Sequence, residues 1–133
     1  MRTGDLNILG DTAGVVGSIP FIIDGGGETI TTGIKGDLEI PFACTITGVT
    51  LQGDASGSIV VDIWKDTYAN FPPTVADTIT ASAKPTLSSA DKSQDTTLTG
   101  WTTSIAAGEI LRFNVDSVAT LTRCTLSLTV IRA

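Results

Sequence analysis

The chain has 133 residues, with 14 acidic and 8 basic side chains and no histidine, so its net charge is −6. The lack of histidine excludes Ser-His-Asp triads, Cys-His dyads and metal sites that need imidazole ligands. The pI near 4.3 argues against binding to a phosphate backbone, so no nucleic-acid partner is expected. The length suits one domain that buries its own core.

Threonine and serine supply most of the polarity. By count, 22 Thr and 10 Ser make up 32 of the 133 residues, whereas only 17% of the residues are charged. Average soluble domains carry about 25% charged residues. Thr is β-branched and suits a pleated surface. The composition therefore predicts a β-rich protein with a surface typical of extracellular or virion proteins and suited to packing against copies of itself.

No apolar run approaches the roughly 18 residues of a membrane-spanning helix. Residues 1–5 are not followed by a continuous apolar segment, which argues against a signal peptide. We therefore expect a chain that is made in the cytosol, is not processed and does not insert into a membrane.

Residues 1–18 predict an extended N-terminal arm. They contain four glycines and scattered apolar side chains with no sustained period. Two interpretations remain open: a flexible terminus, or an arm that anchors the chain by ordering against a partner. The run Leu-Asn-Ile-Leu favours the anchoring arm. The apolar residues available to it are Leu6, Ile8, Leu9, Val15 and Val16.

From residue 19 onward, strand and turn signals alternate. The predicted strands lie at 19–24, 28–32, 37–42, 44–51, 58–65, 78–85, 110–115 and 121–131, with 28–32 and 78–85 the weakest. The alternation slips at Gly48, as at a β-bulge, and residues 53–57 are typical of a turn. Residues 66–77 are expected to form a structured loop, and 86–95 are simply polar.

The last predicted strand has the cleanest inward face, which suits a central strand. Its inward residues are Cys124, Leu126, Leu128 and Val130. With no helical pattern or crossover unit in the chain, the strands predict an all-β fold. We expect residues 19–133 to form an antiparallel, jelly-roll-like β-sandwich of about eight strands behind the arm.

Four aromatic residues are candidates for stacking on a sugar ring or filling an interface: Trp64, Tyr68, Phe71 and Trp101. The alternative is that they have no binding role and complete the core. We favour this second interpretation for the two tryptophans.

Carboxylate pairs are the only route to acid–base catalysis in a chain without histidine. Asp37 and Glu39 share one strand face, and Asp62 and Asp66 flank Trp64. The first pair is more simply the solvent face of an edge strand, so we predict no enzyme. The acidic stretch at 91–95 lacks a calcium-loop pattern, and we predict no metal and no cofactor.

The two cysteines, Cys44 and Cys124, lie far apart in sequence within apolar-alternating segments. We favour two buried core thiols, because free Cys is among the most buried residue types. A disulfide between the first and last sheet strands is the alternative. Neither a CxxC spacing nor a histidine is present to make a metal site.

Three segments, residues 33–46, 57–66 and 98–115, resemble recurrent segments of tailed-bacteriophage virion proteins. In that family these segments form a small β-sandwich, often at the C-terminus of fibre-like proteins behind a shaft or collagen-like stem. The resemblance covers about residues 20–132. It implies a homotrimer on the virion surface and carries no catalytic motif.

This chain departs from the fibre pattern because only the arm precedes the domain, with no stem. We therefore expect a capsid decoration or short head-fibre protein, bound to other virion proteins by its arm. The alternatives are the receptor-binding tip of a tail fibre or spike, and a carbohydrate-binding module that contacts host-surface glycans.

Overall fold

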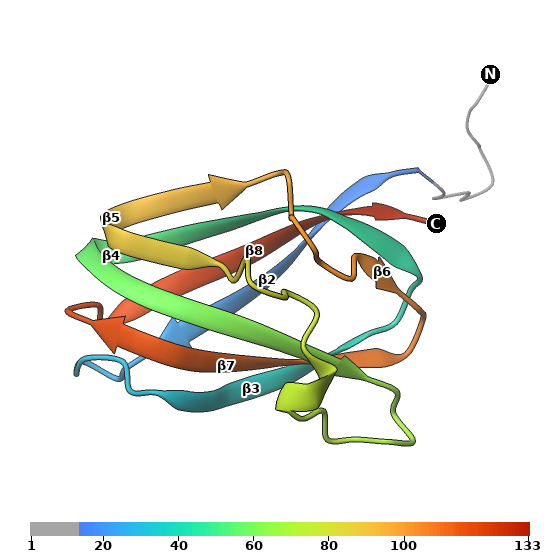
Figure 1. Cartoon of the computed structure of the whole chain (residues 1–133), viewed down its shortest axis with the longest axis horizontal. Coiled ribbons are helices and arrows are strands. Elements are labelled where there is room, and N and C mark those ends of the chain that lie inside the picture. The colour runs from blue at the N-terminus through green and yellow to red at the C-terminus, as the bar shows by residue number, and fades with distance from the viewer. Residues whose placement is uncertain (1–13) are drawn as a thin grey trace.

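The computed structural model describes residues 14–133, and its regular secondary structure is β-strand apart from one 3-10 turn (Figure 1). Its elements are β2 (Val16–Asp24), β3 (Gly33–Ile40), β4 (Cys44–Asp66), the 3-10 turn η1 (Val75–Asp77), β5 (Thr86–Asp95), β6 (Ser104–Ile105), β7 (Glu109–Ala119) and β8 (Arg123–Arg132). Every strand pairing is antiparallel. The predicted all-β, antiparallel class is confirmed.

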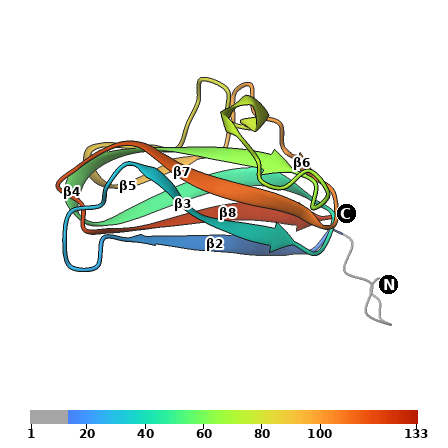
Figure 2. The ribbon, with the colours of Figure 1, turned by 90° about the horizontal axis from the view of Figure 1, so that it is seen from below.

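The strands form one curled sheet in the order β2-β8-β4-β7-β3, and β5 and β6 also pair with β4. The sheet curls because β4 pairs twice: residues 44–53 run along β8, and residues 58–66 run along β7. β7 and β8 follow each other in the chain and run in opposite directions across the turn at 120–122. Because β4 is antiparallel to each of them, it must reverse its direction between these two parts. Figure 2 shows β7 and β8 at different levels of the molecule.

The reversal of β4 depends on two glycines that surround one leucine. A Cβ at Gly53 would lie 2.7 Å from Leu121 Cδ2, and a Cβ at Gly57 would lie 2.8 Å from Leu121 Cγ. Leu121 itself is fully buried. The Asp54 carboxylate, between the glycines, accepts hydrogen bonds from the backbone N–H groups of Thr122 and Arg123, both at 3.1 Å. Residues 53–57, predicted to be a turn between two strands, reverse the chain direction but belong to the continuous strand β4.

The core lies between the inward faces of the curled sheet. The four residues of β8 predicted to point inward are all fully buried, and β8 lies between β2 and β4, so its central position is confirmed. Phe21 stacks on Phe113 with ring centroids 4.2 Å apart. The register shift between Ile46 and Gly48 agrees with the predicted bulge.

The arm boundary predicted after residue 18 is wrong. Strand β2 begins at Val16, and residues 16–18 pair with residues 129–131 of β8. Val15 and Val16 are exposed, and the Val15 carbonyl accepts a hydrogen bond from the Arg132 N–H at 3.0 Å. The other predicted arm residues, Leu6, Ile8 and Leu9, lie outside the described residues.

Two further expectations differ from the structure. Residues 28–32 form part of a turn and not a strand. Within them only Ile30 is buried, and its N–H donates to the Leu121 carbonyl. Residues 78–85 form a loop with one isolated bridge, whereas the polar stretch 86–95 is strand β5. β5 has a polar sequence because Leu87 alone is buried, while the other residues are exposed or half-buried.

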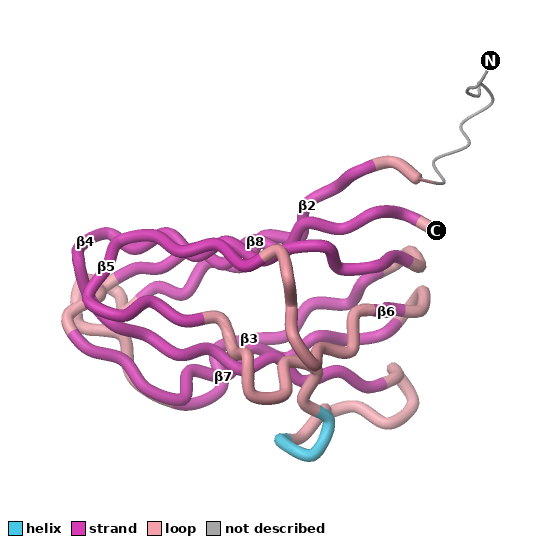
Figure 3. The backbone as a smooth tube through the Cα atoms, turned by 45° about the horizontal axis from the view of Figure 1, so that its top comes forward, coloured by secondary structure: helices cyan, strands magenta, loops and turns pink. Residues whose placement is uncertain are grey.

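The strand directions place the start of β2, the end of β8 and both ends of β4 at one end of the molecule, which we call the terminal end (Figure 1). The long loop after β4, with η1, also begins there (Figure 3). The opposite, distal end carries the turns at 25–32, 53–57 and 120–122.

If close packing around Leu121 requires glycine at the reversal, Gly57→Ala should lower the free energy of unfolding by about 1–3 kcal/mol. Gly17→Ala is the matched control, since its Cβ would meet only Val130 Cγ2 at an ordinary 3.7 Å. It should change stability by less than about 0.5 kcal/mol. Urea unfolding measures both, and equal midpoints for the two variants would contradict the packing argument.

Candidate functional site

The structure separates the four candidate aromatic residues into two pairs. Trp64 and Trp101 are each 9% exposed and belong to the interior, as favoured from the sequence. Tyr68 and Phe71 lie in the loop after β4 and are 75% and 46% exposed. Only Tyr68 and Phe71 therefore remain available to meet a ligand or partner.

Tyr68 borders an open hollow of about 510 Å³ at the terminal end. We call it the Tyr68 hollow; its lining residues are Glu39, Thr67, Tyr68, Ala69, Ala106, Ala107, Gly108 and Glu109. They come from the ends of β3 and β4 and from the turn before β7. An aromatic ring beside carboxylate acceptors can receive a sugar ring, with its apolar face on the ring and its hydroxyls on the acceptors.

The walls of the Tyr68 hollow are held by local hydrogen bonds. Glu109 accepts a bond from the Ala106 N–H at 2.7 Å and pairs with Lys65 at 3.3 Å. The Gly108 N–H donates to the Ile40 carbonyl at 2.7 Å, and the positive φ of Gly108, +88°, suits glycine at this turn. Glu39 is exposed, so its carboxylate faces solvent beside the hollow.

The loop that carries Tyr68 is fixed at both sides of the aromatic residues. At its start, Asp66 Oδ1 accepts a hydrogen bond from the Thr67 N–H at 2.8 Å. Further along, the Arg112 guanidinium lies 5.4 Å from the Phe71 ring centroid and also pairs with Asp37 at 2.8 Å. Asp37 therefore holds the Arg112 guanidinium beside Phe71.

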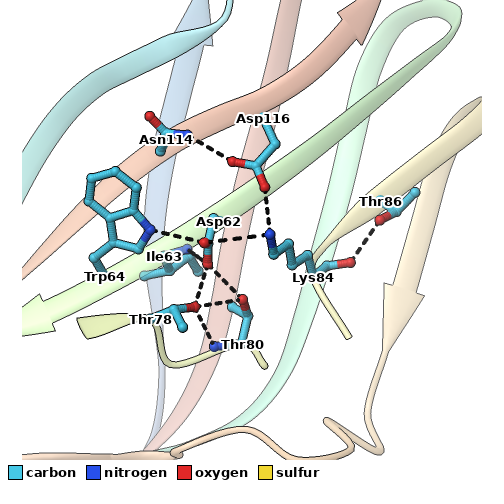
Figure 4. Close-up of polar contacts among 9 residues, drawn as sticks. All are labelled: Asp62, Ile63, Trp64, Thr78, Thr80, Lys84, Thr86, Asn114 and Asp116. Atoms are coloured by element: carbon cyan, nitrogen blue, oxygen red, sulfur yellow. Dashed lines mark hydrogen bonds and ion pairs between the residues drawn. The ribbon is translucent and has the colours of Figure 1, made fainter. Parts of the chain in front are cut away.

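A buried carboxylate holds the next part of this loop against the sheet (Figure 4). Asp62, on the outer face of β4, is only 1% exposed. Its Oδ1 accepts hydrogen bonds from Thr78 Oγ1 at 2.6 Å, Thr80 Oγ1 at 2.7 Å and the Ile63 N–H at 2.9 Å. Its Oδ2 accepts one from Trp64 Nε1 at 2.9 Å.

Lys84 completes the Asp62 cluster. Its Nζ lies 3.7 Å from Asp62 Oδ2 and 2.7 Å from Asp116 Oδ2, and Asn114 Nδ2 donates to Asp116 Oδ1 at 2.8 Å. The hydrogen bond to Asp116 is the main reason that the pKa of Lys84 is raised. The ammonium therefore stays charged and joins the carboxylate of β4 to that of β7.

Burial alone would raise the pKa of Asp62. The hydrogen bonds from Thr78, Trp64 and Thr80, with the charge of Lys84, outweigh burial and lower that pKa below its usual value. Asp62 is therefore a permanent anion near neutral pH, with all its acceptors engaged. This arrangement suits a structural clamp and not a general acid, which needs a raised pKa.

Backbone hydrogen bonds show what the clamp holds. The Ile79 N–H donates to the Ile63 carbonyl at 2.9 Å, and the Val61 N–H donates to the Pro85 carbonyl at 3.0 Å. Trp101 Nε1 donates to the Ala83 carbonyl at 2.8 Å. The loop at 78–85 therefore runs along the edge of β4, bonded to its backbone, and covers both tryptophans.

Sequence reasoning noted Asp62 only as half of a carboxylate pair with Asp66. The two carboxylates have separate hydrogen-bond partners: Asp62 faces the loop at 78–84, whereas Asp66 binds Thr67 and Asn70. The sequence feature that could have predicted the Asp62 cluster is a charged residue inside the most apolar strand of the chain. Such a residue needs buried partners, and Thr78 and Thr80 alternate as a strand face would.

The two cysteines are both free and buried. In the pairing of β4 with β8, Cys44 lies opposite Arg132 and Cys124 lies opposite Gly53. These positions are eight residues apart along β8, about 27 Å, whereas a disulfide needs Cα atoms within about 7 Å. The disulfide alternative is therefore wrong. Burial raises the pKa of Cys124 to about 11, which keeps it a thiol.

Within residues 14–133, no group of three or more His, Cys, Asp or Glu side chains is placed to hold a metal ion. The same residues contain no helix that is long and apolar enough to cross a membrane. No protein-family model matches the chain, and no curated protein matches its sequence.

Because Asp62 is buried with its partners, Asp62→Asn should lower the free energy of unfolding at pH 7 by about 3 kcal/mol. The pKa of Asp62 is lower in the folded state, so its stabilisation is present above about pH 4 and is lost as the pH falls through the folded value. The difference between wild type and variant should therefore shrink below about pH 4.

Urea unfolding at a series of pH values measures this difference. Asp91→Asn, at an exposed residue of β5, is the control and should stay within about 0.5 kcal/mol of wild type. A gap between Asp62→Asn and wild type that is constant from pH 7 to about pH 3 would contradict the role of the ionised carboxylate.

Proposed function

We propose that this chain is a non-enzymatic structural protein of a tailed-phage virion, displayed on the particle as a capsid decoration or short head fibre. The observation that carries this proposal is the distribution of exposed apolar side chains. Among residues 14–133, six of the eight large ones belong to the terminal end or the loop beginning there: Val15, Val16, Tyr68, Phe71, Val75 and Ile131. An apolar end of this kind is typical of an attachment surface.

The strand order supports the jelly-roll interpretation of the fold. If the two parts of β4 and of β5 are counted separately, one layer is β2-β8-β4(44–53)-β5(92–95). The other is β3-β7-β4(57–66)-β5(86–90). Two four-stranded layers connected in this way would match a jelly roll, an architecture shared by viral capsid proteins. The link from that fold to a virion is an analogy, to which the resemblance of residues 33–46, 57–66 and 98–115 adds.

The terminal end is also where the N-terminal residues enter the domain, since Val16 begins β2 opposite Ile131. We therefore propose that residues 1–13 and the terminal end together bind a virion protein, while the distal end projects outward. A homotrimer is part of this proposal, as the family resemblance implies. The chain would be made in the host cytoplasm and act on the assembled particle.

Deleting residues 1–13 should abolish incorporation into particles while leaving the domain folded, because β2 stays complete. Mass spectrometry of purified particles measures incorporation, and circular dichroism of the free protein measures folding. Glu28→Gln, in the distal turn, is the control and should be incorporated like wild type. Normal incorporation of the deletion variant would refute an anchoring role for residues 1–13.

A second candidate function, glycan binding, is favoured by the Tyr68 hollow. Its exposed ring and the exposed Glu39 carboxylate match the needs of a sugar ligand. This function would suit a receptor-binding tip or a carbohydrate-binding module. It requires the terminal end to face outward, so the two candidates predict opposite orientations on a particle.

If the glycan candidate is right, Tyr68→Ala should remove binding on a glycan array, because the stacking ring is lost. Val75→Ala, at an exposed residue of η1 outside the hollow, should bind like wild type. Both changes are at exposed loop positions, so unfolding midpoints should stay close to wild type. A wild-type chain that binds no glycan on the array would refute this candidate.

A further inference from the structure

Most of one outer face of the sheet is free of charge although the chain is acidic. This part is formed by the outward positions of residues 16–22 of β2, 125–131 of β8 and 45–52 of β4, and we call it the neutral face. Its residues are Val16, Ser18, Pro20, Ile22, Thr45, Thr47, Thr50, Gln52, Thr125, Ser127, Thr129 and Ile131. All are exposed or half-buried, and none is charged.

The charged side chains pair on the other side of the curled sheet. All four ion pairs among residues 14–133 involve β3, β7 or residues 62–65 of β4: Arg112–Asp37, Lys65–Glu109, Lys84–Asp62 and Lys84–Asp116. On the neutral side, charge begins only at the margins, with Asp24 opposite Arg123 at the distal end and Lys92 on β5 opposite Gln52.

We propose that the neutral face is the surface through which copies of this chain associate. This inference goes beyond the proposed function: a face that is complementary to itself pairs two copies about a two-fold axis, so it is a contact separate from that of the homotrimer proposed above. Two acidic copies repel each other wherever their charged surfaces meet. If two copies packed through their neutral faces, their charged layers would lie about 30 Å apart, which is three sheet spacings. This distance is well beyond the Debye length of about 8 Å.

The chemistry of the neutral face also fits a second copy. Thr and Ser hydroxyls both donate and accept hydrogen bonds, so the same face is complementary to itself. Its side chains are short, and Thr, Val and Ile are stiff at χ1, so little rotamer freedom is lost on contact. Val16, Ile22 and Ile131 add exposed apolar area, at 65%, 60% and 38%.

Association through the face is favoured over pairing of sheet edges. β2 is the edge strand beside the neutral face, and Pro20 in its middle has no N–H for a strand ladder. Strand addition along β2 would therefore be interrupted at its centre. The neutral face has no such interruption, and its central row is Pro20, Ser127 and Thr50.

The test is sedimentation velocity of the full chain, from about 5 µM to about 500 µM, with charges placed at the centre of the face. Wild type should sediment above 13.7 kDa. Ser127→Lys and Ser127→Glu should both weaken association by roughly tenfold or more, since either charge would be buried against its own copy. If net charge alone mattered, Lys would instead strengthen association of this acidic chain.

Ser117→Lys, at an exposed residue of β7, is the matched control and should associate like wild type. Circular dichroism and unfolding midpoints check that each variant is folded.

A wild type that stays at 13.7 kDa throughout, or Ser127 variants that associate like wild type, would overturn this inference. A monomeric chain that is still incorporated into particles would refute the interface and leave the virion proposal standing. An oligomer that depends on Ser127 but is absent from particles would refute the virion proposal alone.

Discussion

The fold depends on one constraint: β4 must bury its inner face twice, once beside β8 and once beside β7. The chain can satisfy this only by reversing between Gly53 and Gly57, where Leu121 fills the space that two side chains would otherwise occupy. The reversal curls the sheet, encloses the core and brings both ends of β4 to the terminal end. The loop with Tyr68 lies beside the start of the domain for that reason.

The Asp62 cluster extends the same constraint to the outside of the sheet. Residues 61–64 of β4 are buried on both faces, so the outer face also needs a cover, which the loop at 78–85 provides. An ionised carboxylate with four hydrogen bonds and a lysine is a specific way to fix that loop, because any misplacement leaves a buried charge without partners. We interpret it as a clamp that keeps the neighbouring exposed loop in place.

Much of this could be predicted from alternation alone. The inward face of β8, the bulge at Gly48 and the reversal at 53–57 follow from local patterns of apolar residues and glycines. Alternation failed where long-range pairing decides the structure. Residues 86–95 are a strand because β4 offers an edge, and Val16 joins the sheet because β8 extends to Arg132. The terminal end and the neutral face also required the topology, since their residues are far apart in sequence.

The central proposal is that the terminal end attaches this chain to a virion. Cryo-electron microscopy of virus particles assembled in cells that produce this chain tests this proposal most directly. The proposal predicts density for the domain on the particle, with the start of β2 and the Tyr68 hollow against the particle and the turn at 25–32 facing outward. Particles without this chain, or with the Tyr68 hollow facing solvent and the turn at 25–32 against the particle, would contradict it.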